Sequence, residues 1–120
     1  ARAEFRDAVL WYYRTIAKYI APDPGQKAVK GYEMYTAFRD LASVADWEML
    51  LEREAVICGS PDYVTERLHG FQQTYGFTDL LCWTRLGGLD HRKVLRSMEL
   101  MRDKVIPRLR DSQPPPPPAL

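Results

Sequence analysis

The chain has 120 residues, of which 46% are apolar and 28% are charged, with 17 lysines and arginines against 16 acidic residues and a formal net charge of +1. This length allows one domain at most. The near-neutral balance argues against nucleic acid as a partner, and no apolar run approaches the roughly 18 residues that a membrane span needs. We therefore expect a cytoplasmic chain without membrane or nucleic-acid partners.

The first half of the chain is predicted to be helical. From Phe5 to Tyr19, apolar residues recur every three or four positions, which places them on one face of a helix over about residues 4–20. Pro22 ends this helix. Further on, Asp46 is a suitable N-cap for a second, short helix.

The second half contains two short apolar runs, each followed by a helix. Ala55–Cys58 is predicted to be a buried strand. Ser60 then caps a helix that has Pro61 at its first position, and Gly76 allows the left-handed turn that ends it. The second predicted strand, Phe77–Trp83, follows at once.

The last predicted helix is long and contains a proline near its end. Asp90 is its N-cap, and apolar residues recur at helical spacing from Val94 to Leu109. Pro107 lacks a backbone N–H, so it should end or bend this helix near Ile106.

The alternation of strand and helix is that of a βαβ unit, whose two strands are parallel neighbours joined by a right-handed crossover. Two parallel strands alone do not form a stable sheet, because parallel sheets are buried on both faces. We therefore predict an α/β fold, the C-terminal part of a (β/α)8 TIM barrel. Residues 1–53 would be a helical segment and insertion before strand seven, residues 54–111 the last two βα units, and residues 112–120 a proline-rich tail.

Four segments of the second half also carry a resemblance. They are Val56–Val64, Tyr75–Trp83, Val94–Leu100 and Val105–Leu109. Their order and spacing resemble the C-terminal end of the bacterial luciferase-like family of flavin-dependent monooxygenases. In that family a Gly-[Ser/Thr]-Pro turn closes the seventh strand, the eighth strand follows a helix ending in glycine, and the last helix carries a Ser-Met pair and a Pro-x-Leu stop.

This resemblance implies a parent oxidoreductase that binds reduced flavin, as FMN, and activates O2 on a small organic substrate. A deazaflavin-dependent branch of the same barrel family, which transfers hydride, is the alternative. About five strands of the family's barrel are absent from the chain. The resemblance therefore implies that the catalytic residues lie upstream, and that the isolated chain is inactive without the missing strands or a partner subunit. A non-catalytic, truncated βαβα association module is a further alternative. In either case the exposed strand edges favour association, with a partner or as a homo-oligomer.

The candidate cofactor-binding residues are Gly59, Ser60, Trp83 and Arg85, because barrel active sites lie where strands end. Gly59 and Ser60 either present backbone amides to an anion or simply cap the helix. Trp83 and Arg85 either line a flavin cavity or pack beneath the following loop.

The cysteines and histidines do not indicate a metal site. Cys58 and Cys82 each lie in an apolar run, as small buried hydrophobic residues commonly do. His69 and His91 have no partner at the spacing of metal ligands.

Overall fold

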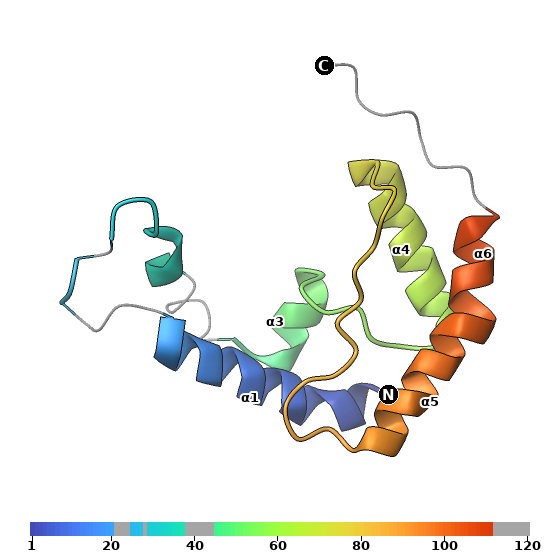
Figure 1. Ribbon diagram of the computed structural model, residues 1–120, viewed down its shortest axis with the longest axis horizontal. Helices are drawn as coiled ribbons and strands as arrows, with labels where there is room; N and C mark the ends of the chain where they lie inside the picture. The colour runs from blue at the N-terminus through green and yellow to red at the C-terminus, as the bar shows by residue number, and fades with distance from the viewer. Residues whose placement is uncertain (21–24, 28, 38–44, 112–120) are drawn as a thin grey trace. The chain divides into compact units, whose positions relative to one another are not determined.

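The computed structural model describes residues 1–20, 25–27, 29–37 and 45–111, which are mainly helical (Figure 1). The predicted proline-rich tail lies outside these residues. The principal elements, in chain order, are α1 (Arg2–Ile20), α3 (Trp47–Glu52), α4 (Pro61–Tyr75), α5 (His91–Leu100), the π-helix η1 (Met101–Val105) and α6 (Ile106–Arg110).

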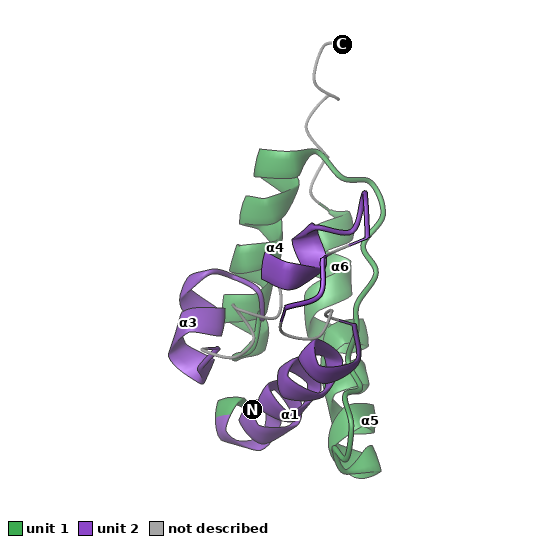
Figure 2. Ribbon diagram, turned by 90° about the vertical axis from the view of Figure 1, so that its left-hand side faces the viewer, with its two compact units in different colours: residues 1–2, 57–120 green, residues 3–56 purple. Residues whose placement is uncertain are grey.

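The chain forms two compact units, coloured separately in Figure 2. One consists of residues 1–2 with residues 57–120, and the other of residues 3–56. The boundary lies between Val56 and Ile57, so the short run predicted as the first strand is divided between the two units.

In the first unit, α4 packs against η1 and α6. The buried side chains of this unit come from α4, from the α5–η1–α6 run and from the segments before α4 and α5. They are Cys58, Thr65, Leu68, Leu86, Val94 and Val105. Buried Thr65 satisfies its hydroxyl locally, since Oγ1 donates to the carbonyl oxygen of Pro61 at 2.7 Å. A small helical core therefore holds this unit together.

Helix α4 begins and ends at the residues that the sequence predicts. Ser60 Oγ accepts a hydrogen bond from the backbone N–H of Tyr63 at 3.2 Å, and Pro61 occupies the first turn. At the other end Gly76 has a left-handed φ of 63°, and its N–H donates to the carbonyl oxygen of Gln72 at 2.9 Å. The predicted caps are confirmed.

Two glycine substitutions should have opposite effects on the stability of α4. Gly76→Ala places a Cβ on a residue with positive φ, and we expect a loss of about 1 kcal/mol. Gly70→Ala is the matched control, because Gly70 lies inside the helix and a Cβ there meets nothing within 4 Å. It should stabilise the unit by about 0.5–1 kcal/mol. Urea denaturation followed by circular dichroism measures both, and equal effects of the two variants would contradict the assignment.

The last helix begins as predicted and then changes its hydrogen-bond register. The Asp90 side chain accepts from the backbone N–H of Arg92 at 2.8 Å. The N–H of Ile106 donates to the carbonyl oxygen of Met101, five residues back, which is the π-helical pattern. Because Pro107 cannot donate to a carbonyl four residues back, the wider turn just before it accommodates the ring. The interruption predicted at Ile106 is thus a π-turn between α5 and α6.

The second unit contains α1 and α3. Val9 of α1 and Leu50 of α3 are almost fully buried, at 0% and 1% exposure. Asp46 caps α3 as predicted, since its Oδ1 accepts from the N–H of Met49 at 2.8 Å. After α3, Glu54 has a φ of 55°, a left-handed conformation that is uncommon for a residue with a side chain.

The prediction of an α/β fold with parallel TIM-barrel strands is wrong. Neither Ala55–Cys58 nor Phe77–Trp83 forms a strand, and no strand occurs elsewhere in the described residues. The two apolar runs lie in irregular segments, and the observed secondary structure is helical.

The backbone hydrogen bonds of the first run explain this difference. The N–H of Val56 donates to the carbonyl oxygen of Leu50 at 3.3 Å, which closes the end of α3. The carbonyl oxygen of Cys58 accepts from Arg2 Nε at 3.0 Å. A strand ladder would need the Val56 N–H and the Cys58 carbonyl as hydrogen-bond partners. Here the first binds the end of α3 and the second binds the side chain of Arg2. Two short runs could not form a stable parallel sheet without further strands.

Candidate functional site

The turn that leads into α4 contains two of the predicted cofactor-binding residues, Gly59 and Ser60. Gly59 lies against the ring of Tyr63, where a Cβ would come within 2.6 Å of Tyr63 Cδ1. A side chain at position 59 would therefore displace the ring. Ser60 acts as the N-cap, so the helix-capping alternative describes its side chain in this structure.

Two arginines from distant parts of the chain meet this turn. Arg2 Nε donates to the carbonyl oxygen of Cys58, and its guanidinium carbon lies 5.2 Å from the centre of the Tyr63 ring, a cation–π contact. Arg108 Nη1 donates to Asp62 Oδ1 at 2.7 Å. We call this group, Arg2, Gly59, Ser60, Asp62, Tyr63 and Arg108, the α4 cap site.

The α4 cap site contains positive groups that would attract an anion and one carboxylate that would repel an anion. The N-terminus of a 15-residue helix carries partial positive charge, and two guanidinium groups lie beside it. The Asp62 carboxylate already neutralises Arg108, although this pair is exposed, at 51% for Arg108 and 87% for Asp62. Exposed pairs are worth about 0–1 kcal/mol, so a phosphate could compete for Arg108 at little cost.

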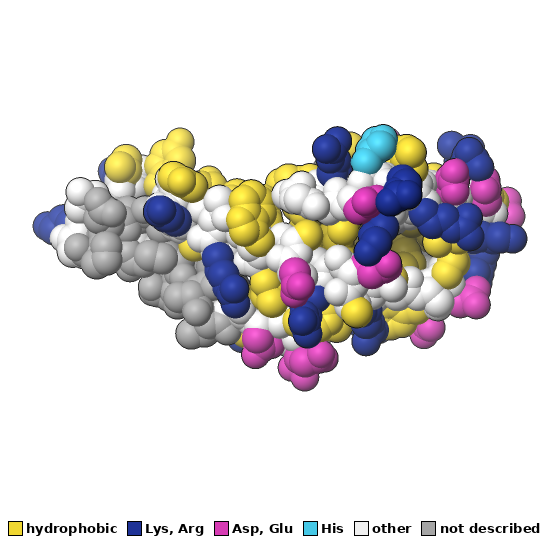
Figure 3. Space-filling model, turned by 90° about the horizontal axis from the view of Figure 1, so that it is seen from below, with side chains coloured by type: hydrophobic (Ala, Val, Ile, Leu, Met, Phe, Trp, Pro, Cys, Tyr) yellow, Lys and Arg dark blue, Asp and Glu magenta, His cyan; other side chains and the backbone are white. Residues whose placement is uncertain are grey.

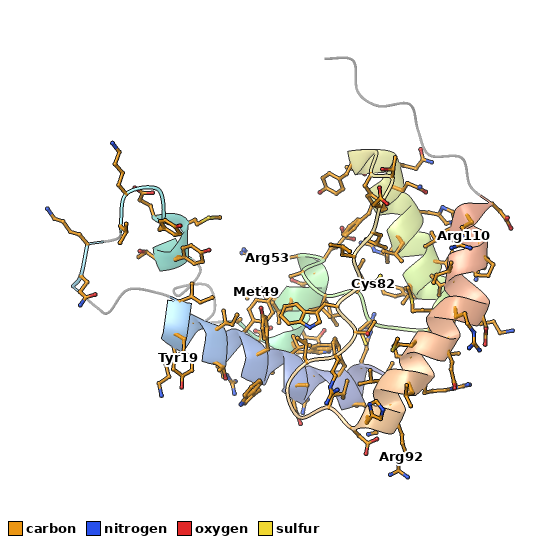
Figure 4. All side chains as sticks on the ribbon, viewed as in Figure 1. Tyr19, Met49, Arg53, Cys82, Arg92 and Arg110 are labelled. Carbon is orange, nitrogen blue, oxygen red and sulfur yellow. The ribbon has the colours of Figure 1, made fainter. Side chains whose placement is uncertain are left out.

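The other two predicted residues, Trp83 and Arg85, lie between α4 and α5 in residues 79–85, which we call the pre-α5 segment. Figure 4 labels Cys82 in the middle of this segment. Trp83 is 65% exposed, and Arg85 is exposed as well. Gly59 and Ser60 therefore form one group at the start of α4, and Trp83 and Arg85 form another in the pre-α5 segment.

The pre-α5 segment also exposes apolar side chains that usually lie inside proteins. Leu81 is 98% exposed. Burying a large apolar side chain such as leucine stabilises a protein by about 1.5–3 kcal/mol. The exposed Leu81 and Trp83 do not contribute this free energy to the folded chain. The segment has the properties of a surface that another molecule, or another part of a protein, can cover.

The two cysteines differ. Cys58 is buried, as predicted, but the prediction that Cys82 is buried is wrong, because the pre-α5 segment is not packed as a strand. Partial desolvation raises the pKa of the Cys82 thiol, so this exposed cysteine is a weak nucleophile at neutral pH.

The arginines of α5 and η1 form a mixed-charge surface. In Figure 3, Lys and Arg side chains gather at the right-hand end, interspersed with Asp and Glu. Arg96 pairs with Glu99 at 3.5 Å and Arg102 with Asp103 at 2.6 Å. Hydrogen bonding from Arg102 lowers the pKa of the Asp103 carboxyl. Such pairing between exposed side chains is typical of a solvated surface.

Sequence reasoning missed Arg2 and Arg108 as members of the α4 cap site. Arg2 is 56 residues away from Cys58, and Arg108 is 46 residues away from Asp62. Only the basic residues in the last turn of the final helix could have drawn attention to Arg108, and no local pattern points to Arg2.

Within the described ranges, no group of three or more His, Cys, Asp or Glu side chains could hold a metal ion. Among the described helices, none is long and apolar enough to cross a membrane. Comparison of the chain with protein-family models, with curated proteins and with solved structures finds no significant match.

Proposed function

We propose that the chain supplies the C-terminal part of a luciferase-like flavin-dependent oxidoreductase that uses reduced flavin and O2 on a small organic substrate. One observation carries the proposal, namely the order and spacing of the turns that resemble this family. The Gly59-Ser60-Pro61 turn starts α4 and Gly76 ends it. Pro107 lies in the last helical turn, before Leu109.

The α4 cap site is the part of the chain that suits the phosphate of FMN. Arg2 and Arg108 would neutralise its charge, and the backbone N–H of Asp62 in the first turn of α4 would donate a hydrogen bond to one of its oxygens. Gly59 allows the close packing of this turn. When bound, reduced flavin supplies the electrons for oxygen chemistry.

The flavin ring fits this chain less completely than the phosphate does. The exposed indole of Trp83 offers a flat face for an aromatic ring system, and Arg85 offers a positive charge two residues away. These groups would orient a cofactor, but they do not exclude water from it. We therefore propose that groups outside this chain complete the site and perform the catalytic steps.

The experiment is a titration of the 120-residue chain with FMN and with riboflavin, which lacks the phosphate, followed by flavin fluorescence. We expect weak binding of FMN, competition by inorganic phosphate, and no detectable binding of riboflavin. Arg108→Ala should weaken FMN binding about tenfold, the loss of one charge-assisted hydrogen bond. Asp62→Asn should strengthen it, because it removes the carboxylate that competes for Arg108.

Arg92→Ala is the matched control, because this exposed arginine lies at the start of α5 and outside the α4 cap site (Figure 4). Equal binding of riboflavin and FMN would contradict the phosphate assignment, as would equal effects of Arg108→Ala and Arg92→Ala. Tight stoichiometric binding of FMN would contradict the view that groups outside the chain complete the site. The same titration with a deazaflavin cofactor tests the hydride-transfer alternative.

A further inference from the structure

The pre-α5 segment has an unused backbone edge as well as exposed side chains. It runs from Asp79 to Arg85 without helix, strand or turn. Within the described part of the chain, Leu80, Leu81 and Cys82 make no backbone hydrogen bond. Figure 1 shows the segment as a long stretch between the end of α4 and the start of α5. Such an edge can accept a strand from another chain.

We infer that residues 79–85 pair antiparallel with the same residues of a second copy of this chain, in the register that places Cys82 opposite Cys82. Pairing of a segment with itself about a twofold axis gives each chain the same contacts and closes the assembly as a dimer. Because alternate residues of an antiparallel pair bond to the partner strand, about half of the backbone groups of Leu80 to Cys82 would then gain partners. This inference does not depend on the flavin proposal, and pairing of the segment would compete with a flavin ring for Trp83 and Arg85.

Charge complementarity selects a second copy and this register. With Cys82 at the centre, Asp79 of each chain lies opposite Arg85 of the other, so two opposite-charge pairs form at the two ends. Leu81 of each chain lies opposite Trp83 of the other, which covers the two most exposed apolar side chains of the segment. Moving the register by one residue removes both charge pairs.

Asp79 and Arg85 are both exposed at the two ends of the segment. Thr78 Oγ1 donates to Asp79 Oδ2 at 2.8 Å, and the Asp79 side chain is exposed. Arg85 is also exposed, next to the buried Leu86 that anchors the end of the segment. Both charged residues therefore flank the apolar part of the segment.

A charge exchange tests the pairing and its register together. In Asp79→Arg, two arginines oppose each other at both ends of the paired segment, and in Arg85→Asp two aspartates do so. We expect each single variant to weaken dimerisation at least about tenfold in sedimentation equilibrium, since two contacts are reversed at once. The double variant restores opposite charges and should dimerise like the natural chain.

Cys82 provides an independent measurement. Directly opposed residues in an antiparallel pair have Cα atoms about 4.5–5.5 Å apart, within the range of a disulfide. Treatment with oxidised glutathione at slightly alkaline pH should therefore oxidise the two Cys82 thiols to an intermolecular disulfide, while the glutathione is reduced. This covalent dimer should form in Cys58→Ser and not in Cys82→Ser. A chain that sediments as a monomer at high concentration would overturn the inference. So would a double charge variant that fails to recover dimerisation, or a dimer that persists in Leu81→Asp.

Discussion

Val105→Asp is expected to abolish cooperative folding of the helical unit formed by α4, α5, η1 and α6. Val105 is 1% exposed and lies in η1, which packs against α4. An aspartate there would bury a charge without a partner, a change that typically costs more than about 4 kcal/mol. A core of this size rarely supplies more than about 3–5 kcal/mol, so the variant should populate the unfolded state.

Lys104→Asp is the matched control, since it introduces the same side chain at the neighbouring, exposed position. We expect it to change the free energy of unfolding by less than about 1 kcal/mol. Thermal unfolding followed by far-UV circular dichroism, together with amide hydrogen exchange of α4, distinguishes the two variants. Equal melting curves for Val105→Asp and the natural chain would show that η1 does not pack on α4 as described.

Leu50→Ala is expected to destabilise the unit of residues 3–56 by about 2–5 kcal/mol. Leu50 is 1% exposed in α3, and truncating a fully buried leucine removes apolar contacts and leaves a cavity. The nearby indole of Trp47, which is 8% exposed, should respond with a red-shifted fluorescence as water reaches it.

The measurement uses a background in which Trp11 and Trp83, both more than half exposed, are replaced by phenylalanine so that Trp47 reports alone. Glu52→Ala in the same helix is the control, because Glu52 is exposed and its loss should cost less than about 0.5 kcal/mol. A Leu50→Ala variant as stable as Glu52→Ala would mean that α3 is not part of a packed core.

The helices of this chain were predictable because their signals are local. Ser60, Gly76 and Asp90 act through hydrogen bonds or backbone angles within a few residues of themselves, and each caps the predicted helix. Pro107 likewise affects the backbone just before it, although residue type and spacing alone do not indicate the π-turn that accommodates it. The caps depend on residue type and spacing, which the sequence states directly.

The prediction of strands is wrong because a strand depends on hydrogen bonds to residues far away in the sequence. An apolar run such as Ala55–Cys58 has the composition of a buried strand, but its backbone groups need a neighbouring strand as hydrogen-bond partner. Here those groups bind the end of α3 and the side chain of Arg2. In the pre-α5 segment, the backbone N–H and C=O groups of Leu80, Leu81 and Cys82 make no hydrogen bond within the described residues.

The candidate site likewise combines features that local sequence determines with features that only long-range packing determines. By itself the sequence determined that Gly59 and Ser60 stand at a helix N-terminus, where backbone amides can meet an anion, because helix capping is a property of neighbouring residues. Only the tertiary structure brought Arg2 and Arg108 to that turn, and only it left Leu81 and Trp83 in solvent. Contacts between residues far apart in the chain depend on how the helices pack, which local patterns do not encode.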